Sequence, residues 1–359
     1  MKAPFIQDSS FLSKINRVRV SEGRDLENGL RLDRNERVQD WGKQFLVDVF
    51  SKSPEYLLST YPDQTRLYSL ISKFHNIDPS NLLLTSGIDG GIKTILEICT
   101  KPGDCVGVLS PTYAMYKVYS DIFQISLNEI SYNEDLSFNF LAVKNYISTR
   151  PKILFIPNPN QPIEDTLSLK LLDQLASICL EANTLIVFDE AYNLFGADTA
   201  IPLISKYPNT IVARTFSKAF GMPSIRLGYL ISSNANMNIL SKSRLAHESN
   251  SLSNYIAEYL LCNFNLIEDY VECVINCREK MMNYFHSINI KARAQYGNFV
   301  LIDVQTPERA SRCVSYLRER KIYVKGPWKT PYEQYITITL GPYESMKKFV
   351  TEFSSFLAN

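Results

Sequence analysis

Short apolar runs alternate with amphipathic segments through the middle of the chain. Runs such as 82–85 and 153–156 are rich in Leu, Ile and Phe and predict buried strands. Between the runs, apolar residues return at helical spacing, so the order predicts an α/β fold with a largely parallel, doubly wound sheet. The expected strands are 82–85, 106–109, 125–130, 153–156, 184–188 and 211–213, and the expected helices between them are 92–99, 114–121 and 167–181. A further apolar segment follows at 225–231.

The pattern changes on both sides of this region. Helices are expected at 43–60 and 64–75, separated by Tyr61-Pro62-Asp63, where proline restricts Tyr61 to an extended conformation. A long helical pattern at 254–285 predicts a connector. Beyond it we expect a smaller α+β lobe, with strands at 299–304, 322–325 and 336–340 and helices at 307–320 and 343–357.

Polar side chains gather where the expected strands end. In an open parallel sheet, ligands bind beyond the carboxyl ends of the strands. The sequence therefore predicts a binding site at this edge of the sheet. The residues concerned are Asp89, Tyr113, Asn158, Asp189, Tyr192, Ser217 and Lys218.

The segment after the expected strand at 211 combines Ser217, Lys218 and, eight residues further, Arg226. A lysine between two apolar runs is costly to bury as a cation. It is tolerable when the amine is neutral or covalently modified, and the pKa of lysine shifts readily on desolvation. A Ser-Lys pair alone is more often part of a surface turn, so the remaining motifs decide the interpretation.

A phosphate site is expected at the turn Ser86-Gly87-Ile88-Asp89-Gly90-Gly91. Small residues between a strand and a helix leave backbone N–H groups exposed at the positive end of the helix dipole. The turn matches neither of the two common glycine-rich phosphate motifs, so on its own it is a weak signal.

Composition excludes several classes of function. The 359 residues carry a net charge of +1 and are 45% hydrophobic, which predicts a large core and no basic face for nucleic acid or membrane. The first residues are too polar for a secretory signal. The seven cysteines form no Cys-x-x-Cys pair and only three histidines are present. We therefore expect reduced thiols, no metal and a cytoplasmic protein.

These residues suit a cofactor with an aldehyde, a nitrogen-containing ring and a phosphate. Lys218 can hold the aldehyde as a Schiff base and, once released, act as the base that moves a proton. Asp189 can pair with the ring nitrogen so that the ring accepts electrons. Ser217 and Arg226 can take the phosphate. Tyr113 can stack on the ring, and Tyr192 can bond its hydroxyl.

The motifs LDRNE, YPD, TSGIDGGI, SPTYAMY, PNPNQP, FDEAY and RTFSKAFGMPSIRLGY occur in that order between residues 32 and 230. Together they resemble a fold-type-I pyridoxal-phosphate enzyme, and most closely the histidinol-phosphate aminotransferase group of the class I/II aminotransferases. The resemblance implies a PLP-transferase fold of type I. It also implies an N-terminal segment (1–45) that joins the small domain, a large cofactor domain (46–264) and a small C-terminal domain (265–359).

The resemblance assigns roles residue by residue. Lys218 is the lysine that bonds the cofactor, Asp189 the partner of the ring nitrogen, and Tyr192 the partner of the ring hydroxyl. Tyr61, in YPD, implies a homodimer in which this tyrosine reaches the neighbouring subunit's cofactor phosphate. The other implied cofactor contacts are Gly87, Ile88, Asp89, Tyr113, Asn158, Gln161, Ser217 and Arg226.

The sequence departs from the family at two places. Gln161 stands where the family has the asparagine that touches the ring hydroxyl. The arginine that forks onto a substrate α-carboxylate aligns with Thr337, and a second family arginine aligns with Lys325. Threonine cannot supply the fork, and lysine is a point charge rather than a bidentate donor.

These departures suggest a substrate without an α-carboxylate in the usual place. We expect a phosphorylated or sugar-like keto compound, held by Lys325. Arg34 and Asn298 are further candidate substrate contacts, and Arg37 and Arg293 are candidate anion contacts that are more simply explained as surface arginines.

Two other functions compete with transamination. A decarboxylase of a phosphorylated amino acid would use the same cofactor residues. A regulator or carrier without turnover would have no need of Lys218, Asp189 and Tyr192 together, and a DNA-binding regulator would need a basic appendage.

Overall fold

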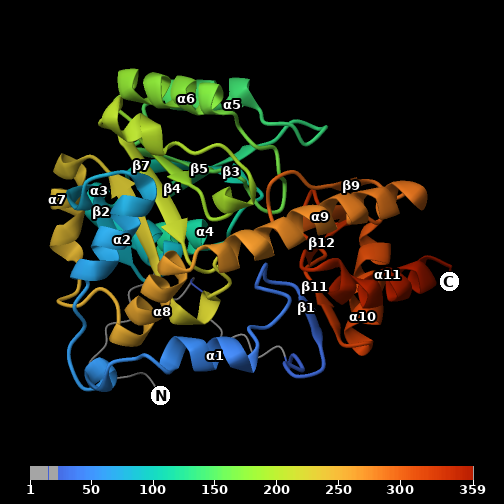
Figure 1. Ribbon diagram of the computed structural model, residues 1–359. Coiled ribbons are helices and arrows are strands. Elements are labelled where there is room, and N and C mark those ends of the chain that lie inside the picture. The colour runs from blue at the N-terminus through green and yellow to red at the C-terminus, as the bar shows by residue number, and fades with distance from the viewer. Residues whose placement is uncertain (1–14, 16–22, 359) are drawn as a thin grey trace, which may run out of the picture.

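The computed structural model describes residue 15 and residues 23–358. The beginning of the expected N-terminal segment therefore lies outside the described residues. The fold has a large sheet with helices on both sides, and a smaller part that contains the C-terminal helices (Figure 1).

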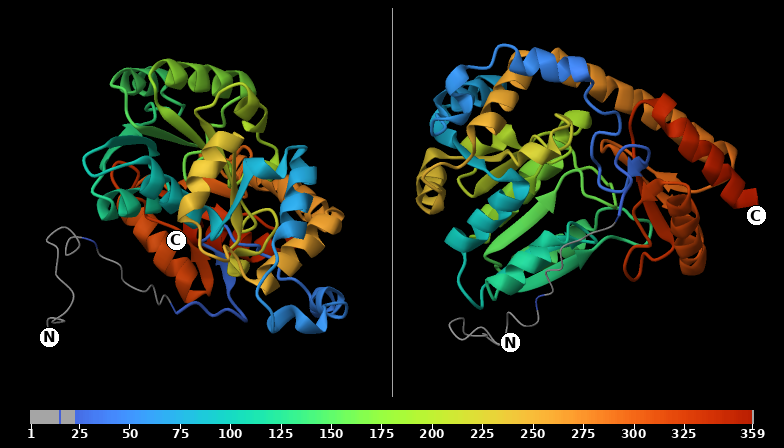
Figure 2. Two further views of the ribbon diagram at one scale, coloured as in Figure 1. Left: turned by 90° about the vertical axis from the view of Figure 1, so that its left-hand side faces the viewer. Right: turned by 90° about the horizontal axis from the view of Figure 1, so that it is seen from below.

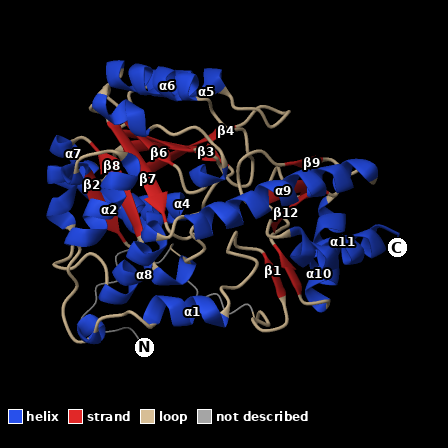
Figure 3. Cartoon of the chain, in the orientation of Figure 1, coloured by secondary structure: helices blue, strands red, loops and turns tan. Residues whose placement is uncertain are grey.

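The large sheet has seven strands in the described chain, in the order β2-β8-β7-β6-β5-β3-β4. Figure 3 shows its strands in red with helices in blue around them. Only β8 runs antiparallel to its neighbours β2 and β7. The largely parallel, doubly wound sheet expected from the sequence is thus confirmed. The strands are β2 (Leu82–Thr85), β3 (Cys105–Ser110), β4 (Ser126–Ser131), β5 (Ile153–Pro157), β6 (Leu185–Asp189), β7 (Thr210–Thr215) and β8 (Gly228–Ser232).

Apolar side chains on both faces of each central strand explain why these runs are continuous. On β6, Val187 belongs to one hydrophobic cluster, whereas Ile186 and Phe188 belong to the other. Burial on both faces removes the polar alternation that a half-exposed strand would show. The first face is covered by α3 (Gly87–Cys99), α4 (Met115–Ile122) and α7 (Asn234–Leu240), and the second by α2 (Thr65–His75), α5 (Phe140–Ser148), α6 (Leu169–Glu181) and α8 (Ser251–Cys262).

The smaller part is built on two short sheets. An antiparallel sheet has the order β12-β10-β9, and β1 pairs in parallel with β11. The long helix α9 (Asn265–Ser287) runs from the large sheet to this part (Figure 2). Its other elements are β1 (Leu30–Leu32), β9 (Ala292–Arg293), β10 (Phe299–Asp303), α10 (Pro307–Glu319), β11 (Ile322–Val324), β12 (Tyr335–Thr339) and α11 (Tyr343–Ala358).

Two helix predictions were wrong. The helix expected at 43–60 ends at Phe50 as α1 (Lys43–Phe50), because Pro54 favours an extended residue before it, and only a short 3-10 turn follows. The helix expected at 254–285 is divided into α8 and α9. Between them the Asn263 side chain donates to the carbonyl of Tyr259, satisfying a helix-end group and ending α8. None of the helices in the described chain is long and apolar enough to cross a membrane.

A buried carboxylate fastens the two parts together beside the site. Glu164 follows the PNPNQP loop and is fully buried. It accepts hydrogen bonds from the backbone N–H groups of Gln295, at 2.8 Å, and of Tyr296 and Gly297. These residues belong to the loop between β9 and β10. These hydrogen bonds offset the cost of burying the carboxylate. The contact therefore holds the loop that carries Gln161 against the smaller part.

Candidate active site

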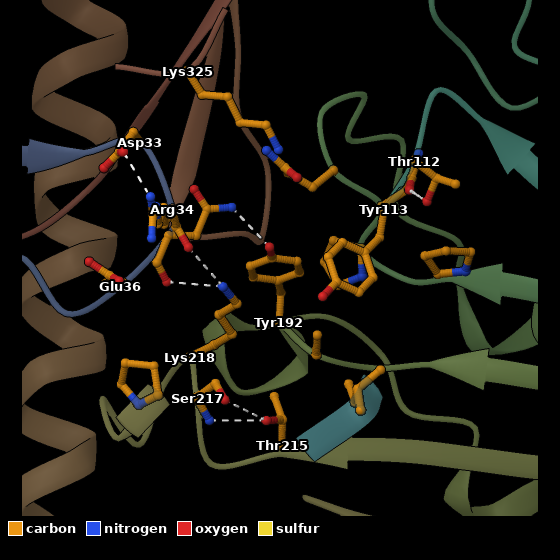
Figure 4. A pocket seen from close by; sticks show the side chains of 18 of the residues that line it. Asp33, Arg34, Glu36, Thr112, Tyr113, Tyr192, Thr215, Ser217, Lys218 and Lys325 are labelled. Carbon is orange, nitrogen blue, oxygen red and sulfur yellow. Dashed lines mark hydrogen bonds and ion pairs between the residues drawn. The ribbon is translucent and has the colours of Figure 1, made fainter. Parts of the chain in front are cut away.

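A cavity of about 870 Å³ lies between the carboxyl edge of the large sheet and the smaller part. Figure 4 shows Lys218 and Lys325 entering it from opposite sides, with the rings of Tyr192 and Tyr113 beside the space between them. The structure thus brings most of the sequence-predicted residues together. Those that line the cavity are Arg34, Ile88, Asp89, Tyr113, Gln161, Asp189, Tyr192, Ser217, Lys218, Arg226 and Lys325.

Lys218 follows β7 in the turn Phe216–Ala219. Its amine donates to the backbone carbonyls of Arg34 at 3.0 Å and Asn35 at 3.3 Å. Burial, followed by the positive charge of Lys325, lowers the pKa of Lys218 to about 8. A substantial fraction of the amine is therefore neutral near pH 8 and able to act as a nucleophile or base.

Asp189 ends β6 and is held in a fixed orientation. The hydroxyl of Tyr116 donates to Oδ2 at 2.7 Å, and the backbone N–H of Ala191 donates to Oδ1 at 3.1 Å. Burial raises the pKa of Asp189 to about 6. A cationic partner in the cavity would offset this burial, so the site is suited to a protonated ring nitrogen. Sequence reasoning missed Tyr116, although it lies only three residues after Tyr113 in the SPTYAMY motif.

The loop after β6 is fixed by a buried ion pair. Glu190 meets Arg214 at 2.6 Å and accepts from the hydroxyl of Thr199 at 2.9 Å. Asp189 and Tyr192 line the cavity, whereas Glu190 between them does not. The hydroxyl of Tyr192 accepts a hydrogen bond from the side-chain amide of Asn35 at 2.9 Å.

One end of the cavity gathers anion-binding groups. Arg226 lies 3.4 Å from the carboxylate of Asp89, which also accepts from the hydroxyl of Tyr113 at 2.8 Å. Helix α3 begins at Gly87 rather than at Ile92, so the glycine-rich turn forms its first turn. A Cβ at Gly87 would come within 3.0 Å of the Arg226 guanidinium, and φ there is +67°, so glycine keeps the helix N-terminus accessible.

Two hydroxyls complete this end. Thr215 and Ser217 share a hydrogen bond of 3.0 Å, and both line the cavity. Sequence reasoning missed Thr215, although it lies two residues before Ser217 in the RTFSK motif. Hydroxyls, an arginine and a helix N-terminus are groups that commonly bind phosphate in proteins.

Four of the expected site residues lie off the cavity wall. Gly87 lies against the guanidinium group of Arg226. The buried side chain of Asn158 bonds the backbone of Leu167, accepting at 2.8 Å and donating at 3.3 Å. Asn298 is buried and donates to the carbonyl of Asn35 at 3.2 Å. Tyr61 is 83% exposed and stacks on His247.

The wall contributed by the smaller part is cationic. Lys325 follows β11 and lies over the ring of Trp328 at 4.4 Å. Arg318, on α10, also lines this wall and was not singled out in the sequence. Thr337, at the position of the family's carboxylate-binding arginine, is 1% exposed and pairs through its backbone with Lys325. The cavity therefore has cations on this wall but no arginine on β12.

The other two arginines considered as anion contacts are engaged elsewhere. Arg37 stacks between the rings of Trp41 and Tyr270, at 3.9 Å and 3.8 Å. Arg293 bonds Asp165 at 2.8 Å and the carbonyl of Glu164 at 2.7 Å. Neither lines the cavity. Within the described ranges, no group of three or more His, Cys, Asp or Glu side chains is placed to hold a metal ion.

The family model for "Aminotransferase class I and II" matches residues 27–353. The chain belongs to this family. It is 32% identical over 303 residues to histidinol-phosphate aminotransferase of Christiangramia forsetii, covering 82% of this chain and 85% of that one. It is 28% identical over 331 residues to histidinol-phosphate aminotransferase 1 of Carboxydothermus hydrogenoformans, covering 91% and 93%.

Solved structures agree with the fold. The crystal structure of histidinol-phosphate aminotransferase from Sinorhizobium meliloti, in complex with pyridoxal-5′-phosphate, has a TM-score of 0.84 at 20% identity and covers 91% of this chain and 90% of that chain. The Thermus thermophilus aspartate aminotransferase tetra mutant 1 has a TM-score of 0.78 at 19% identity, covering 97% and 99%. This aminotransferase therefore has the fold type I that its sequence resembles.

The residues of the cavity fit pyridoxal 5′-phosphate, the cofactor of this enzyme. The fit rests on three features of the structure: the half-buried amine of Lys218 with its lowered pKa, the buried carboxylate of Asp189, and the arginine, hydroxyls and helix N-terminus around Arg226. When bound, the cofactor supplies an aldehyde that exchanges with amines and a ring that accepts electrons. The two relatives and the two structural neighbours are all named as aminotransferases, and no observation favours the decarboxylase alternative.

Proposed function

We propose that this aminotransferase transfers an amino group between a donor and a phosphorylated keto compound that carries no α-carboxylate at the usual position. This proposal rests on the wall formed by the smaller part, which carries cations but has Thr337 where the family has its carboxylate-binding arginine. Lys325 and Arg34 would face the substrate's phosphate, which needs charge but no planar fork. The names of the relatives support a phosphorylated substrate.

We propose the following division of work in the site. Asp189 holds the cofactor ring nitrogen, while Ser217, Thr215 and Arg226 hold its phosphate. With the cofactor bound, the amine of Lys218 would act as the base that takes a proton from the substrate carbon, a role suited to a group with a pKa near the working pH. The carbonyls of Arg34 and Asn35 accept hydrogen bonds from this amine and would orient it in the cavity.

The substrate preference is tested with the first half-reaction. Histidinol phosphate, histidinol and glutamate are each mixed with the loaded enzyme, and the change in cofactor absorbance is followed. We expect kcat/KM for histidinol phosphate to exceed that for histidinol by about 100-fold, from one charged contact worth roughly 3 kcal/mol. Equal values for the two amines would contradict a phosphate-binding wall.

Lys325→Ala should raise KM for the phosphorylated substrate about 10- to 100-fold and leave kcat much less changed, because the contact acts on a remote anionic group. Steady-state kinetics measures both constants. Lys325→Arg keeps the charge and should recover most of the affinity. Lys329→Ala, an exposed lysine outside the cavity wall, is the matched control. An unchanged KM in Lys325→Ala would show that this lysine does not bind substrate.

We further propose a homodimer with shared sites. Large apolar side chains are exposed on and after α1. Exposed apolar patches of this kind often mark the surfaces at which protein subunits associate. They are Leu46, Val47, Phe50, Tyr56, Leu58 and Tyr61. Tyr61 does not line the cavity of its own chain, which supports its expected role in the neighbouring subunit's phosphate site.

A mixing experiment tests this sharing. Tyr61→Phe and Lys218→Ala each damage a site, but a mixed dimer contains one site with an intact lysine and an intact tyrosine. Equal mixing after subunit exchange should therefore restore about a quarter of native activity. Assay of the mixture against the separate variants decides it. Activity that never exceeds the mean of the two separate variants would contradict shared sites.

We also propose that the domains divide at 45/46 and 264/265 and that the protein is cytoplasmic. Pairing of β1 with β11 supports assigning the N-terminal segment to the smaller part. The cysteines, all seven of which lie in the described chain, are free, which supports a reducing compartment.

A further inference from the structure

Asn35 is a buried junction between the cavity and the smaller part. It is 3% exposed, and its φ of +54° lies in the left-handed region, which costs free energy for a residue other than glycine. Its backbone N–H donates to the hydroxyl of Thr339 at 2.9 Å. Its backbone carbonyl accepts from Lys218 and Asn298. Its side chain bonds Thr339 and Tyr192.

These contacts fix the direction of each hydrogen bond. The hydroxyl of Thr339 accepts from the Asn35 N–H, so its own proton is available for the Asn35 side-chain oxygen, 3.2 Å away. The amide oxygen of Asn35 is thereby directed to Thr339. The amide nitrogen must then face Tyr192, to whose oxygen it donates at 2.9 Å.

The direction at Tyr192 has a chemical consequence. A phenol has a single proton, and the Asn35 amide already donates to the phenol oxygen. The Tyr192 proton is therefore directed away from Asn35 and toward another acceptor on the cavity side. Tyr192 lines the cavity, and its ring is fixed by the edge of Phe299.

We propose that Asn35 and Thr339 are positioning residues that make Tyr192 a hydrogen-bond donor into the cavity. The acceptor is an anionic oxygen on the cofactor ring. Thr339 belongs to β12, the strand that carries Thr337. A residue of the smaller part thus determines whether Tyr192, which follows β6 of the large sheet, donates or accepts a hydrogen bond in the cavity. The inference rests on pyridoxal phosphate occupying the cavity, as in the proposed function.

The test measures the pH midpoint at which the visible band of the loaded enzyme titrates. A donor to an anionic ring oxygen stabilises the deprotonated form and keeps this midpoint low. In Asn35→Asp the new carboxylate accepts the Tyr192 proton instead, so the midpoint should rise by about one unit. The dissociation constant for pyridoxal phosphate, from equilibrium dialysis, should rise about tenfold. Charged groups around Tyr192 are Lys218, Asp189 and Glu164, which all remain.

Two further variants separate this role from folding. Thr339→Val keeps the shape but releases the Asn35 amide, and should shift the midpoint in the same direction by a smaller amount. Thr339→Ser keeps the hydroxyl and should restore the native midpoint. In a Tyr192→Phe background, Asn35→Asp should cause no additional shift, because the responding group has been removed.

The outcomes distinguish the inference from the cofactor assignment. A native enzyme with no visible band after addition of pyridoxal phosphate would reject the cofactor. A normal band whose midpoint is unmoved in both Asn35→Asp and Thr339→Val would overturn the positioning role. An equal shift from Asn35→Asp in the Tyr192→Phe background would likewise overturn it, since the effect would then bypass Tyr192.

Discussion

Lys218→Ala should reduce transamination by at least about 10⁴-fold and should abolish covalent retention of pyridoxal phosphate. The lysine is the proposed general base, a role worth about 10² to 10⁴ in rate, and it is also the residue proposed to bond the cofactor. Lys325 belongs to the smaller part and enters the cavity from the side opposite Lys218 (Figure 4). Its amine therefore cannot take over the role of the Lys218 amine. Turnover assays and mass spectrometry after borohydride reduction measure the two losses.

The matched control for this variant is Lys206→Ala. Lys206 is an exposed lysine paired with Asp173 at 2.6 Å, and an exposed pair contributes little to stability. It should keep both activity and cofactor. Exogenous methylamine should restore part of the rate to Lys218→Ala if only the amine is missing. Retention of more than about a hundredth of native activity in Lys218→Ala would exclude the lysine as base.

Asp189→Asn should reduce turnover by about 10³-fold. The amide cannot stabilise a protonated ring nitrogen as a carboxylate does, and removing one aligned electrostatic group from an active site costs about 10² to 10³ in rate. The fold should survive, because Asn fills the same space. Asp121→Asn on the exposed face of α4 controls for loss of a carboxylate, and its activity should be native.

The same variant should remove one component of the pH dependence of cofactor binding. Because burial raises the pKa of Asp189 to about 6, the carboxyl holds a proton below that pH and would have to release it to pair with a protonated ring nitrogen. Affinity for pyridoxal phosphate should therefore fall about tenfold per unit as the pH drops below 6. Equilibrium dialysis at several pH values measures it. The same fall in Asp189→Asn would show that another group titrates.

Tyr116→Phe is the conservative companion of that experiment. Its hydroxyl stabilises the ionised form of Asp189 through a 2.7 Å hydrogen bond, so its removal should move the binding transition to higher pH. A role confined to packing would leave the transition in place, since phenylalanine keeps the ring.

The sequence was sufficient where the signal was local. The central strands of the large sheet are continuous apolar runs because both of their faces are buried, and the polar residues that follow them meet at one edge by the geometry of a parallel sheet. Asp189, Lys218 and Arg226 could be found for this reason. The break in the 43–60 helix was also local, at Pro54, but the helical spacing on either side of the proline is the more conspicuous pattern.

The missed residues depend on contacts between distant segments. Asn35 approaches Tyr192 only because β1 pairs with β11, near the other end of the chain, with Leu30 opposite Ile322. Arg318 reaches the cavity wall only through the packing of α10 on that strand. The pairing of Glu164 with the 295–297 loop likewise has no signal in either segment alone. Periodicity and turn chemistry report on neighbours in sequence, so such contacts are not accessible to them.

The most direct test of the central claim is a visible spectrum of the purified protein with pyridoxal phosphate, before and after addition of histidinol phosphate. We expect an absorbance band that is absent in Lys218→Ala, and its conversion to the pyridoxamine form with one equivalent of keto product per site. No band in the unaltered protein, or a band that persists in Lys218→Ala, would contradict the assignment of Lys218 and the cavity. A stable band with release of carbon dioxide from a phosphorylated amino acid would contradict transamination.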